Sequence, residues 1–252
     1  MPRYDFRTPR LFVDAPLDAG RTIDLETAQA NYLGNVLRLK TGDSVLLFNG
    51  REGEWRGELI RPGKRTLAVA VTARTREQTP PLDLDYLFAP LKHARLDYMV
   101  QKAVEMGAAR LQPIITRHTQ AARVNLERMR ANAIEAAEQC GILTLPEIGA
   151  PRAFAEMIGA RDPGRLLVFC DEDAEVKDPV AALTAARPAG ATGPVPVAVL
   201  IGPEGGFAEE ERATLLRLPN TVRLALGPRI LRADTAAVAA LALVGAVLGD
   251  WR

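Results

Sequence analysis

The stretch VPVAVLIGPEGGF, Val195–Phe207, passes from a run of apolar residues through three glycines and a proline. The acidic segment AEEERATLLRL follows it directly, at residues 208–218. The apolar run predicts a buried strand, and the acidic segment predicts an amphipathic helix. Glycine adopts backbone angles that other residues avoid and lets another molecule approach the main chain closely. The stretch therefore predicts a strand, a turn open to a ligand and a helix; a tight turn without a ligand is the simpler alternative.

The same alternation of strand and helix patterns extends along the rest of the chain beyond residue 82. Apolar strand patterns lie at 84–90, 110–116, 165–172 and 221–227. Helical patterns follow them at 93–107, 125–141, 178–187 and 235–249. Continuous apolar strands that alternate with helices predict an α/β domain whose mostly parallel sheet is covered on both faces. In such a sheet, ligands bind beyond the carboxyl ends of the strands.

The first part of the chain has a different pattern. Short β-branched or alternating segments lie at 10–14, 21–25, 44–50, 54–60 and 66–73, separated by turn residues, with one helical segment at 26–39. Strands at this spacing predict a small β-barrel. The polar, proline-containing segment TREQTPPLDLD is typical of a domain boundary. We therefore expect one domain over residues 1–76 and a second over residues 77–252.

Composition and charge limit the class of protein. The chain has 252 residues, 48% hydrophobic and 25% charged, as in globular proteins. Its net charge is only +1, but residues 1–78 carry 13 Lys/Arg against 10 Asp/Glu, which leaves room for a local basic patch. The apolar segment Thr235–Gly249 is short for a membrane span and predicts a buried helix. With no signal-like N-terminus, these features predict a cytoplasmic protein without a membrane.

The two cysteines are far apart and have no metal-ligand spacing. Cys140 and Cys170 therefore predict neither a disulfide nor a zinc site, and no other cluster of ligands suggests a metal. Cys140 is interpreted as a small buried hydrophobe.

Three predicted strand ends carry unusual residues: VFCDED at 168–173, GPEGG at 202–206 and LGPRILR at 226–232. Asp234 is interpreted as the N-cap of the last helix. The glycine fingerprints of dinucleotide-binding proteins and P-loop proteins are absent. Turns of glycine, proline and apolar residues favour an adenine ring held by main-chain hydrogen bonds and apolar contacts.

These motifs resemble those of a known family. IGPEGGF followed by LALGPRILRADTA is similar to the paired C-terminal motifs of the RsmE family, the ribosomal RNA uridine-N3 methyltransferases of the SPOUT superfamily. DYMVQKAVEMGAARLQPIIT and RANAIEAAEQCGILTLPEI resemble the family's central segments. NYLGNVLRLKTGDSVLLFNG resembles its PUA-like RNA-binding domain. The resemblance thus covers both expected domains in order.

The resemblance implies a pocket for S-adenosyl-L-methionine formed by a C-terminal trefoil knot, and a homodimer. The residues assigned to cofactor binding are Leu200, Gly202, Pro203, Glu204, Gly205, Gly206, Leu226, Gly227, Ile230 and Leu231. The family usually has Thr and Glu after LR, whereas this chain has Ala233 and Asp234. This departure weakens any catalytic role for those two positions.

Methyl transfer to a uridine N3 requires positioning and stabilisation of the charge that develops on the base. Arg232 is the first candidate for a catalytic residue that contacts the uridine or its phosphate, and Arg229 is the second. The alternative is that one of them pairs with Asp234 or Glu204 and only stabilises the loop. No general base is identifiable, and structural roles are expected for His93 and His118.

Basic residues of the first domain are candidates for RNA binding, because cations that track phosphates supply most of the affinity for nucleic acid. They are Arg3, Arg7, Arg10, Arg38 and Lys40, with Arg61, Lys64 and Arg65 as a possible extension. A solvated N-terminus is the alternative for the first three.

The resemblance thus implies an S-adenosylmethionine-dependent methyltransferase that acts on N3 of a uridine in small-subunit (16S) ribosomal RNA, free or within the assembled 30S particle. One alternative is a SPOUT methyltransferase acting on another RNA base, for example in tRNA. Another is a non-catalytic RNA-binding assembly factor that has kept the fold.

Overall fold

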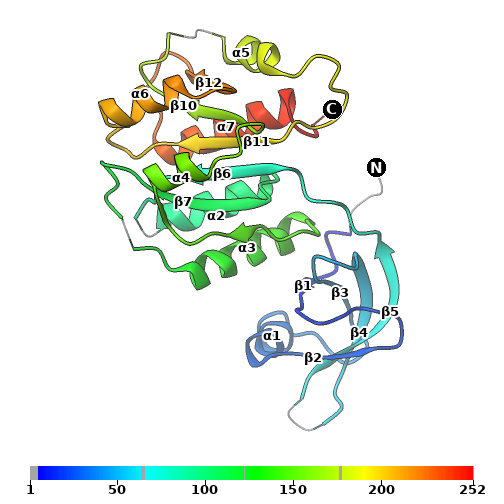
Figure 1. Ribbon diagram of the computed structural model, residues 1–252. Helices are drawn as coiled ribbons and strands as arrows, with labels where there is room; N and C mark the ends of the chain where they lie inside the picture. Colours follow the sequence, from blue (N-terminus) through cyan, green and yellow to red (C-terminus); the bar gives the residue numbers. More distant parts are fainter. Residues whose placement is uncertain (1–4, 64–65, 93, 122, 176–177, 252) are drawn as a thin grey trace. The chain divides into compact units, whose positions relative to one another are not determined.

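The structure is a computed structural model and describes residues 5–63, 66–92, 94–121, 123–175 and 178–251. The chain divides into two compact units (Figure 1). The first comprises Met1–Pro80 and Ala137–Leu145, and the second comprises Pro81–Ala136 and Pro146–Arg252. Helix α3, Leu126–Cys140, therefore contributes its last residues to the first unit.

The first unit contains a curled five-stranded sheet in the spatial order β1-β3-β4-β5-β2. β1 pairs parallel with β3, and the other neighbours are antiparallel. Alternate residues such as Val45, Leu47, Leu59 and Val69 point to one buried core. The strands are those that the sequence predicts, with shifted ends: β1 (Arg10–Phe12), β2 (Thr22–Asp24), β3 (Ser44–Phe48), β4 (Glu54–Ile60) and β5 (Ala68–Arg76).

The predicted helical segment at 26–39 is an α-helix that continues as a π-helix. α1 spans Thr27–Asn31, and the π-helical turn η1 spans Tyr32–Val36. π-helical turns are rare and often occur at functional sites. Leu33 anchors the turn in the core, whereas Val36 is 61% exposed. Arg38 then adopts a φ of 58°, in the left-handed region that non-glycine residues seldom occupy.

The second unit contains the predicted α/β sheet. Its strand order is β12-β10-β11-β6-β7-β8, and every neighbouring pair is parallel. The strands are β6 (Leu84–Phe88), β7 (Arg110–Ile115), β8 (Glu147–Ile148), β10 (Leu166–Cys170), β11 (Val197–Ile201) and β12 (Thr221–Leu224), and β9 (Arg152–Ala153) pairs with β7. The helices besides α3 are α2 (Ala94–Glu105), α4 (Phe154–Ala160), α5 (Pro179–Ala186), α6 (Glu209–Arg217) and α7 (Ala233–Val247). The short elements β8, β9 and α4 were not predicted.

Burial on both faces of the sheet explains its continuous apolar strands. All five residues of β11 are buried. Met157 of α4 and Leu215 of α6 pack in one core cluster with Phe169 of β10 and Leu200 of β11. The Ala-rich segment predicted to be a buried helix forms α7, which has Ala237, Ala240, Leu241 and Val244 in the interior. Among the described residues, no helix combines the length and apolar character of a membrane span.

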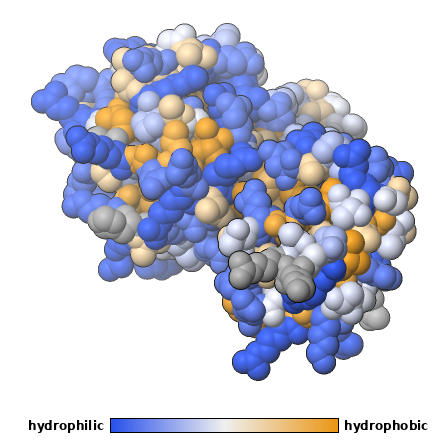
Figure 2. Space-filling view, turned by 90° about the horizontal axis from the view of Figure 1, so that it is seen from below, coloured by the Kyte–Doolittle hydropathy of each residue, from blue (hydrophilic) through white to orange (hydrophobic). Residues whose placement is uncertain are grey.

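One prediction about the surface is wrong. Cys140, the last residue of α3, is exposed rather than buried. Figure 2 shows one face of the molecule, where hydrophobic residues form patches among hydrophilic ones.

Strand order brings three predicted strand ends together. β10 lies between β12 and β11, and Cys170 is in register with both Leu224 and Ile201. Because these strands are parallel, the turns that follow them leave the same edge of the sheet. The segments 171–175, 202–208 and 225–232 therefore meet at this edge.

Candidate functional site

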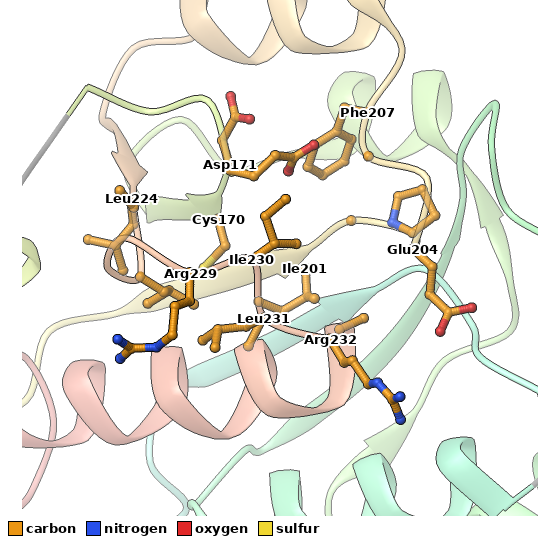
Figure 3. A pocket seen from close by; sticks show the side chains of 18 of the residues that line it. Cys170, Asp171, Ile201, Glu204, Phe207, Leu224, Arg229, Ile230, Leu231 and Arg232 are labelled. Atoms are coloured by element: carbon orange, nitrogen blue, oxygen red, sulfur yellow. The ribbon is translucent and has the colours of Figure 1, made fainter.

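The three strand ends enclose a pocket of about 560 Å³ (Figure 3). It includes the carboxyl ends of β10, β11 and β12 and reaches Ala233 and Ala236 at the start of α7. Eleven of the predicted cofactor and catalytic residues line it: Gly202, Pro203, Glu204, Gly205, Gly206, Leu226, Gly227, Arg229, Ile230, Leu231 and Arg232.

Leu200 does not belong to this set. It lies inside β11, has no exposed surface and packs in the core cluster with α4 and α6. Side chains alternate along a strand, so Leu200 faces away from the side on which its neighbour Ile201 borders the pocket. The Leu200 side chain is therefore part of the core and does not line the pocket.

The glycines of the GPEGG turn are explained by close approach. Gly206 has a φ of 71°, and a Cβ atom there would lie 2.6 Å from Glu172 Oε1. A Cβ atom on Gly202 would lie 2.9 Å from the Phe207 ring. The main chain of the turn therefore packs against the Phe207 ring on one side and against Glu172 on the other. A side chain at either glycine would change the shape of the pocket.

Asp171 and Glu172, which follow β10, form an acidic wall of the pocket. The side chain of Asp171 is fully buried and accepts a hydrogen bond from Arg223 Nε at 2.8 Å, and Arg212 Nε lies 3.1 Å from the same oxygen. Arg212 also lies 3.6 Å from Glu172. These arginines hold the wall in place and balance much of its charge. Glu172, with 43% of its side chain exposed, is the carboxylate that borders the pocket most openly.

Cys170 borders the pocket but is not suited to nucleophilic chemistry. Burial, together with the smaller effect of the Asp171 charge, raises the pKa of its thiol to about 12. The thiol is therefore protonated at any physiological pH, and the thiolate is the reactive form of cysteine.

Arg229 and Arg232 are exposed at the edge of the pocket. In Figure 3 their guanidinium groups point outward on opposite sides of it. Neither forms an ion pair with any carboxylate in the described part of the chain. The carboxylates proposed as their partners are held by another residue: Arg95 Nη1 donates to Glu204 Oε1, and Arg95 Nε lies 3.9 Å from Asp234 Oδ2. The alternative of a structural ion pair at Arg229 or Arg232 is therefore wrong.

The start of α7 also differs from the prediction. The helix begins at Ala233 with Arg232 as its N-cap residue, so Asp234 is the second residue of the helix rather than its cap. Its carboxylate is in the first turn, where a negative charge interacts favourably with the helix dipole. Ala233 is buried and borders the pocket.

Two residues outside the three strand ends support the GPEGG turn. Arg95 lies in the first turn of α2, and its partners are more than 100 residues away, so no local pattern could reveal it. The second is His118, for which the sequence predicted only a structural role. Its Nδ1 is 3.1 Å from the carbonyl oxygen of Gly206. His93 is outside the described residues.

The candidate RNA-binding residues of the first unit separate into two groups. Arg7, Arg38, Lys40 and Arg61 are exposed, and their side chains have no ion-pair partner among the described residues. Arg10 differs: 6% of its side chain is exposed, and its Nε donates to Glu54 Oε2 at 2.8 Å. Its other nitrogens donate to the carbonyl oxygens of Ala137, Glu138 and Ile142 at the end of α3. Arg3, Lys64 and Arg65 are outside the described residues.

Arg10 is therefore not available to phosphate groups, and its assignment to RNA binding is wrong. The cause is its position in β1, where the guanidinium meets the end of α3, whose last carbonyl groups lack helical partners. The short, charge-assisted contacts hold Arg10 inside the unit.

Comparisons with known proteins identify similar chains. Residues 78–245 match a family model described as an RNA methyltransferase domain, and residues 25–72 match one described as an RNA methyltransferase PUA domain. The ribosomal RNA small subunit methyltransferase E of Synechocystis is 31% identical over 90% of this chain and 74% of its own. The enzyme of the same name from Rickettsia conorii is 29% identical over 93% of this chain and 94% of its own.

A solved structure shares the whole architecture. It is a ribosomal RNA small subunit methyltransferase E from Neisseria gonorrhoeae bound to S-adenosyl methionine. It superposes with a TM-score of 0.83 at 25% identity and covers 98% of this chain and all of its own.

Proposed function

The chain belongs to the ribosomal RNA small subunit methyltransferase E family, and from this we propose that it methylates N3 of a uridine in small-subunit ribosomal RNA with S-adenosylmethionine as donor. The observation that carries the proposal is the pocket between the three strand ends, with two exposed arginines at its edge that have no carboxylate partner among the described residues. Apolar and glycine-rich walls suit an adenosyl group, and the arginines suit an RNA substrate.

The residues of the pocket fit the cofactor. The closely packed glycines Gly202 and Gly206 leave main-chain groups at the pocket surface, where they can bind adenine. Leu226, Ile230 and Leu231 supply apolar contacts. Glu172 is the acceptor available to ribose hydroxyl groups or to a cationic centre. When bound, S-adenosylmethionine supplies a methyl carbon carried on a positively charged sulfur.

Arg232 and Arg229 have the catalytic role in this proposal. To accept a methyl group, N3 would lose its proton to solvent, and this loss would place negative charge on N3 and on the uridine carbonyl oxygens. A guanidinium without a competing carboxylate stabilises that charge or fixes the adjacent phosphate. Glu204 and Asp234 are less suited as general bases because Arg95 already pairs with both.

The RNA-binding surface of the first unit is proposed to comprise Arg7, Arg38, Lys40 and Arg61. Next to Arg38, the exposed residues Val36 and Leu37 provide apolar contact area, which suits unstacked bases. We further propose that the curled sheet is a PUA-like barrel, that the C-terminal segment forms a trefoil knot, and that the enzyme works as a homodimer on the RNA or the 30S particle in the cytoplasm. Relatives with the same domain order support these proposals.

The experiment that tests this function is nucleoside mass mapping. Unmodified small ribosomal subunits are incubated with the protein and isotope-labelled S-adenosylmethionine, and the RNA is digested and mapped. We expect the label in N3-methyluridine at a single position. Label in another nucleoside would favour a different RNA methyltransferase, and cofactor binding without any label would favour an assembly factor.

A further inference from the structure

We propose that Arg95 is a positioning residue that joins the two segments carrying the cofactor pocket and keeps Arg232 from pairing with their carboxylates. This inference rests on the proposed function of the pocket and assigns a role to a residue outside its walls. Arg95 is in the first turn of α2, on a different element from every strand end that forms the pocket.

The contacts of Arg95 join separate parts of the site. Its Nη1 donates to Glu204 in the turn after β11. Its Nε lies 3.9 Å from Asp234, two residues after Arg232. Among the ion pairs of the described residues, no other side chain reaches both the GPEGG turn and the start of α7. A planar guanidinium with several donors is suited to such a bridge, because one group can serve two carboxylates.

The bridge restrains the exposed part of the GPEGG turn. The GPEGG turn contains three glycines and is exposed at Glu204 and Gly205. On one side the His118 ring contacts the carbonyl group of Gly206. Arg95 adds an anchor on the side of α7. Without it, the turn and the start of α7 would lose their shared ion-pair partner on α2, and the width of the pocket between them would be less defined.

The bridge also affects the charge near Arg232. Asp234 follows Arg232 by two residues in the sequence, and Glu204 lines the same pocket as Arg232. Arg95 pairs with both, so Arg232 remains available for RNA. Removal of Arg95 would leave two carboxylates free to attract Arg232, and this would compete with binding of the uridine or its phosphate.

The ion pairs are partly exposed, with 37% of Arg95 and 41% of Glu204 accessible, so their effect on overall stability is small. A role limited to stability would leave cofactor affinity and turnover unchanged. A positioning role predicts lower affinity for the cofactor and slower turnover in a protein that is still folded. The two possibilities are therefore separable by comparing cofactor binding, turnover and thermal unfolding in the same variants.

The test compares Arg95→Ala, Arg95→Lys, Glu204→Gln and the double variant Arg95→Ala/Glu204→Gln with the wild type. Arg128→Ala is the matched control, because Arg128 forms an exposed pair with Asp97 of the same helix α2 and does not border the pocket. Calorimetry measures the Kd for S-adenosylmethionine, and methyl incorporation into unmodified subunits measures kcat. Thermal unfolding verifies that each variant is folded.

For Arg95→Ala we expect Kd to rise about fivefold and kcat to fall about tenfold or more, because small displacements of reacting groups are costly. Arg95→Lys should recover part of both losses. The double variant should bind the cofactor no more weakly than Arg95→Ala, because both changes remove the same contact. Arg128→Ala should behave like the wild type.

A wild-type Kd and kcat for Arg95→Ala would overturn the inference. A double variant whose loss of cofactor affinity is the product of the losses in Arg95→Ala and Glu204→Gln would also overturn it. An equal loss in Arg128→Ala would also overturn it, since any ion pair of α2 would then have the same effect. If the wild-type protein itself binds no S-adenosylmethionine, the proposed function fails, independently of Arg95.

Discussion

Arg10 in the first unit and Arg232 in the second are both arginines next to a strand or helix end, yet their surroundings are opposite. Arg10 is buried, pairs with Glu54 and donates to three carbonyl groups. Arg232 is exposed, and no carboxylate in the described part of the chain pairs with it, although Glu204 lines the same pocket and Asp234 is two residues further along the chain. The comparison shows that the partners of an arginine, rather than its presence in a basic segment, distinguish a structural arginine from a functional one.

The largest effect on stability should come from breaking the buried ion pair between Arg10 and Glu54. Glu54→Ala leaves Arg10, and also Arg76 at 3.4 Å, without their shared carboxylate. Removing one partner of a buried ion pair costs about 3–5 kcal/mol. We expect the unfolding transition of the first unit in urea to shift to a markedly lower concentration. Replacing both partners with apolar residues, Arg10→Met with Glu54→Leu, should restore much of the loss. An unchanged midpoint for Glu54→Ala would contradict the structural role of Arg10.

The next largest effect should be on catalysis at Arg232. Arg232→Ala removes the exposed guanidinium, and loss of one charge-stabilising donor typically costs about 10²–10³-fold in turnover. We expect methyl incorporation to fall by about that factor while S-adenosylmethionine binding stays measurable and stability is unchanged. Arg217→Ala is the control, since Arg217 is an exposed arginine in the last turn of α6. Full activity of Arg232→Ala would exclude Arg232 from the mechanism.

The smallest effects should come from the exposed cations of the first unit. Arg38→Ala and Lys40→Ala should each lower the slope of log affinity against log salt for ribosomal RNA by roughly one, because each removes one phosphate contact. Their stability should change by less than about 0.5 kcal/mol. Arg51, which is exposed but paired with Asp14 at 3.2 Å, provides the control, since its replacement should change the slope less. Slopes for Arg38→Ala and Lys40→Ala that equal the wild-type slope would exclude the proposed RNA-binding surface.

Local patterns predicted much of this molecule. The apolar runs located the strands, and the parallel arrangement of β10, β11 and β12 brought their three ends to one edge. The glycines of the GPEGG turn predicted a turn open to a ligand; in the structure Gly202 and Gly206 are approached closely by Phe207 and Glu172 of the same chain. These features depend on residues that are near one another in the sequence, so the pattern of side chains contains them.

Other features depend on distant residues and could not be predicted in this way. Arg10 appeared to be one of a series of N-terminal arginines, because its acceptors at the end of α3 come more than 120 residues later. Arg95 had no recognisable motif, because its partners Glu204 and Asp234 are brought to it by the fold of the sheet. Leu200 was assigned to the cofactor site from the resemblance, and the packing of β11 against distant elements places its side chain in the core instead.

The most direct test is a calorimetric titration of S-adenosylmethionine into the wild-type protein and into Gly206→Val. Gly206 has a positive φ and lies against Glu172, so a valine there would strain the backbone and clash with the Glu172 carboxylate. The pocket between the three strand ends predicts saturable binding by the wild type and at least about tenfold weaker binding by the variant. Absence of binding by the wild type at millimolar cofactor, or equal affinity in both proteins, would contradict the assignment of this pocket to the methyl donor.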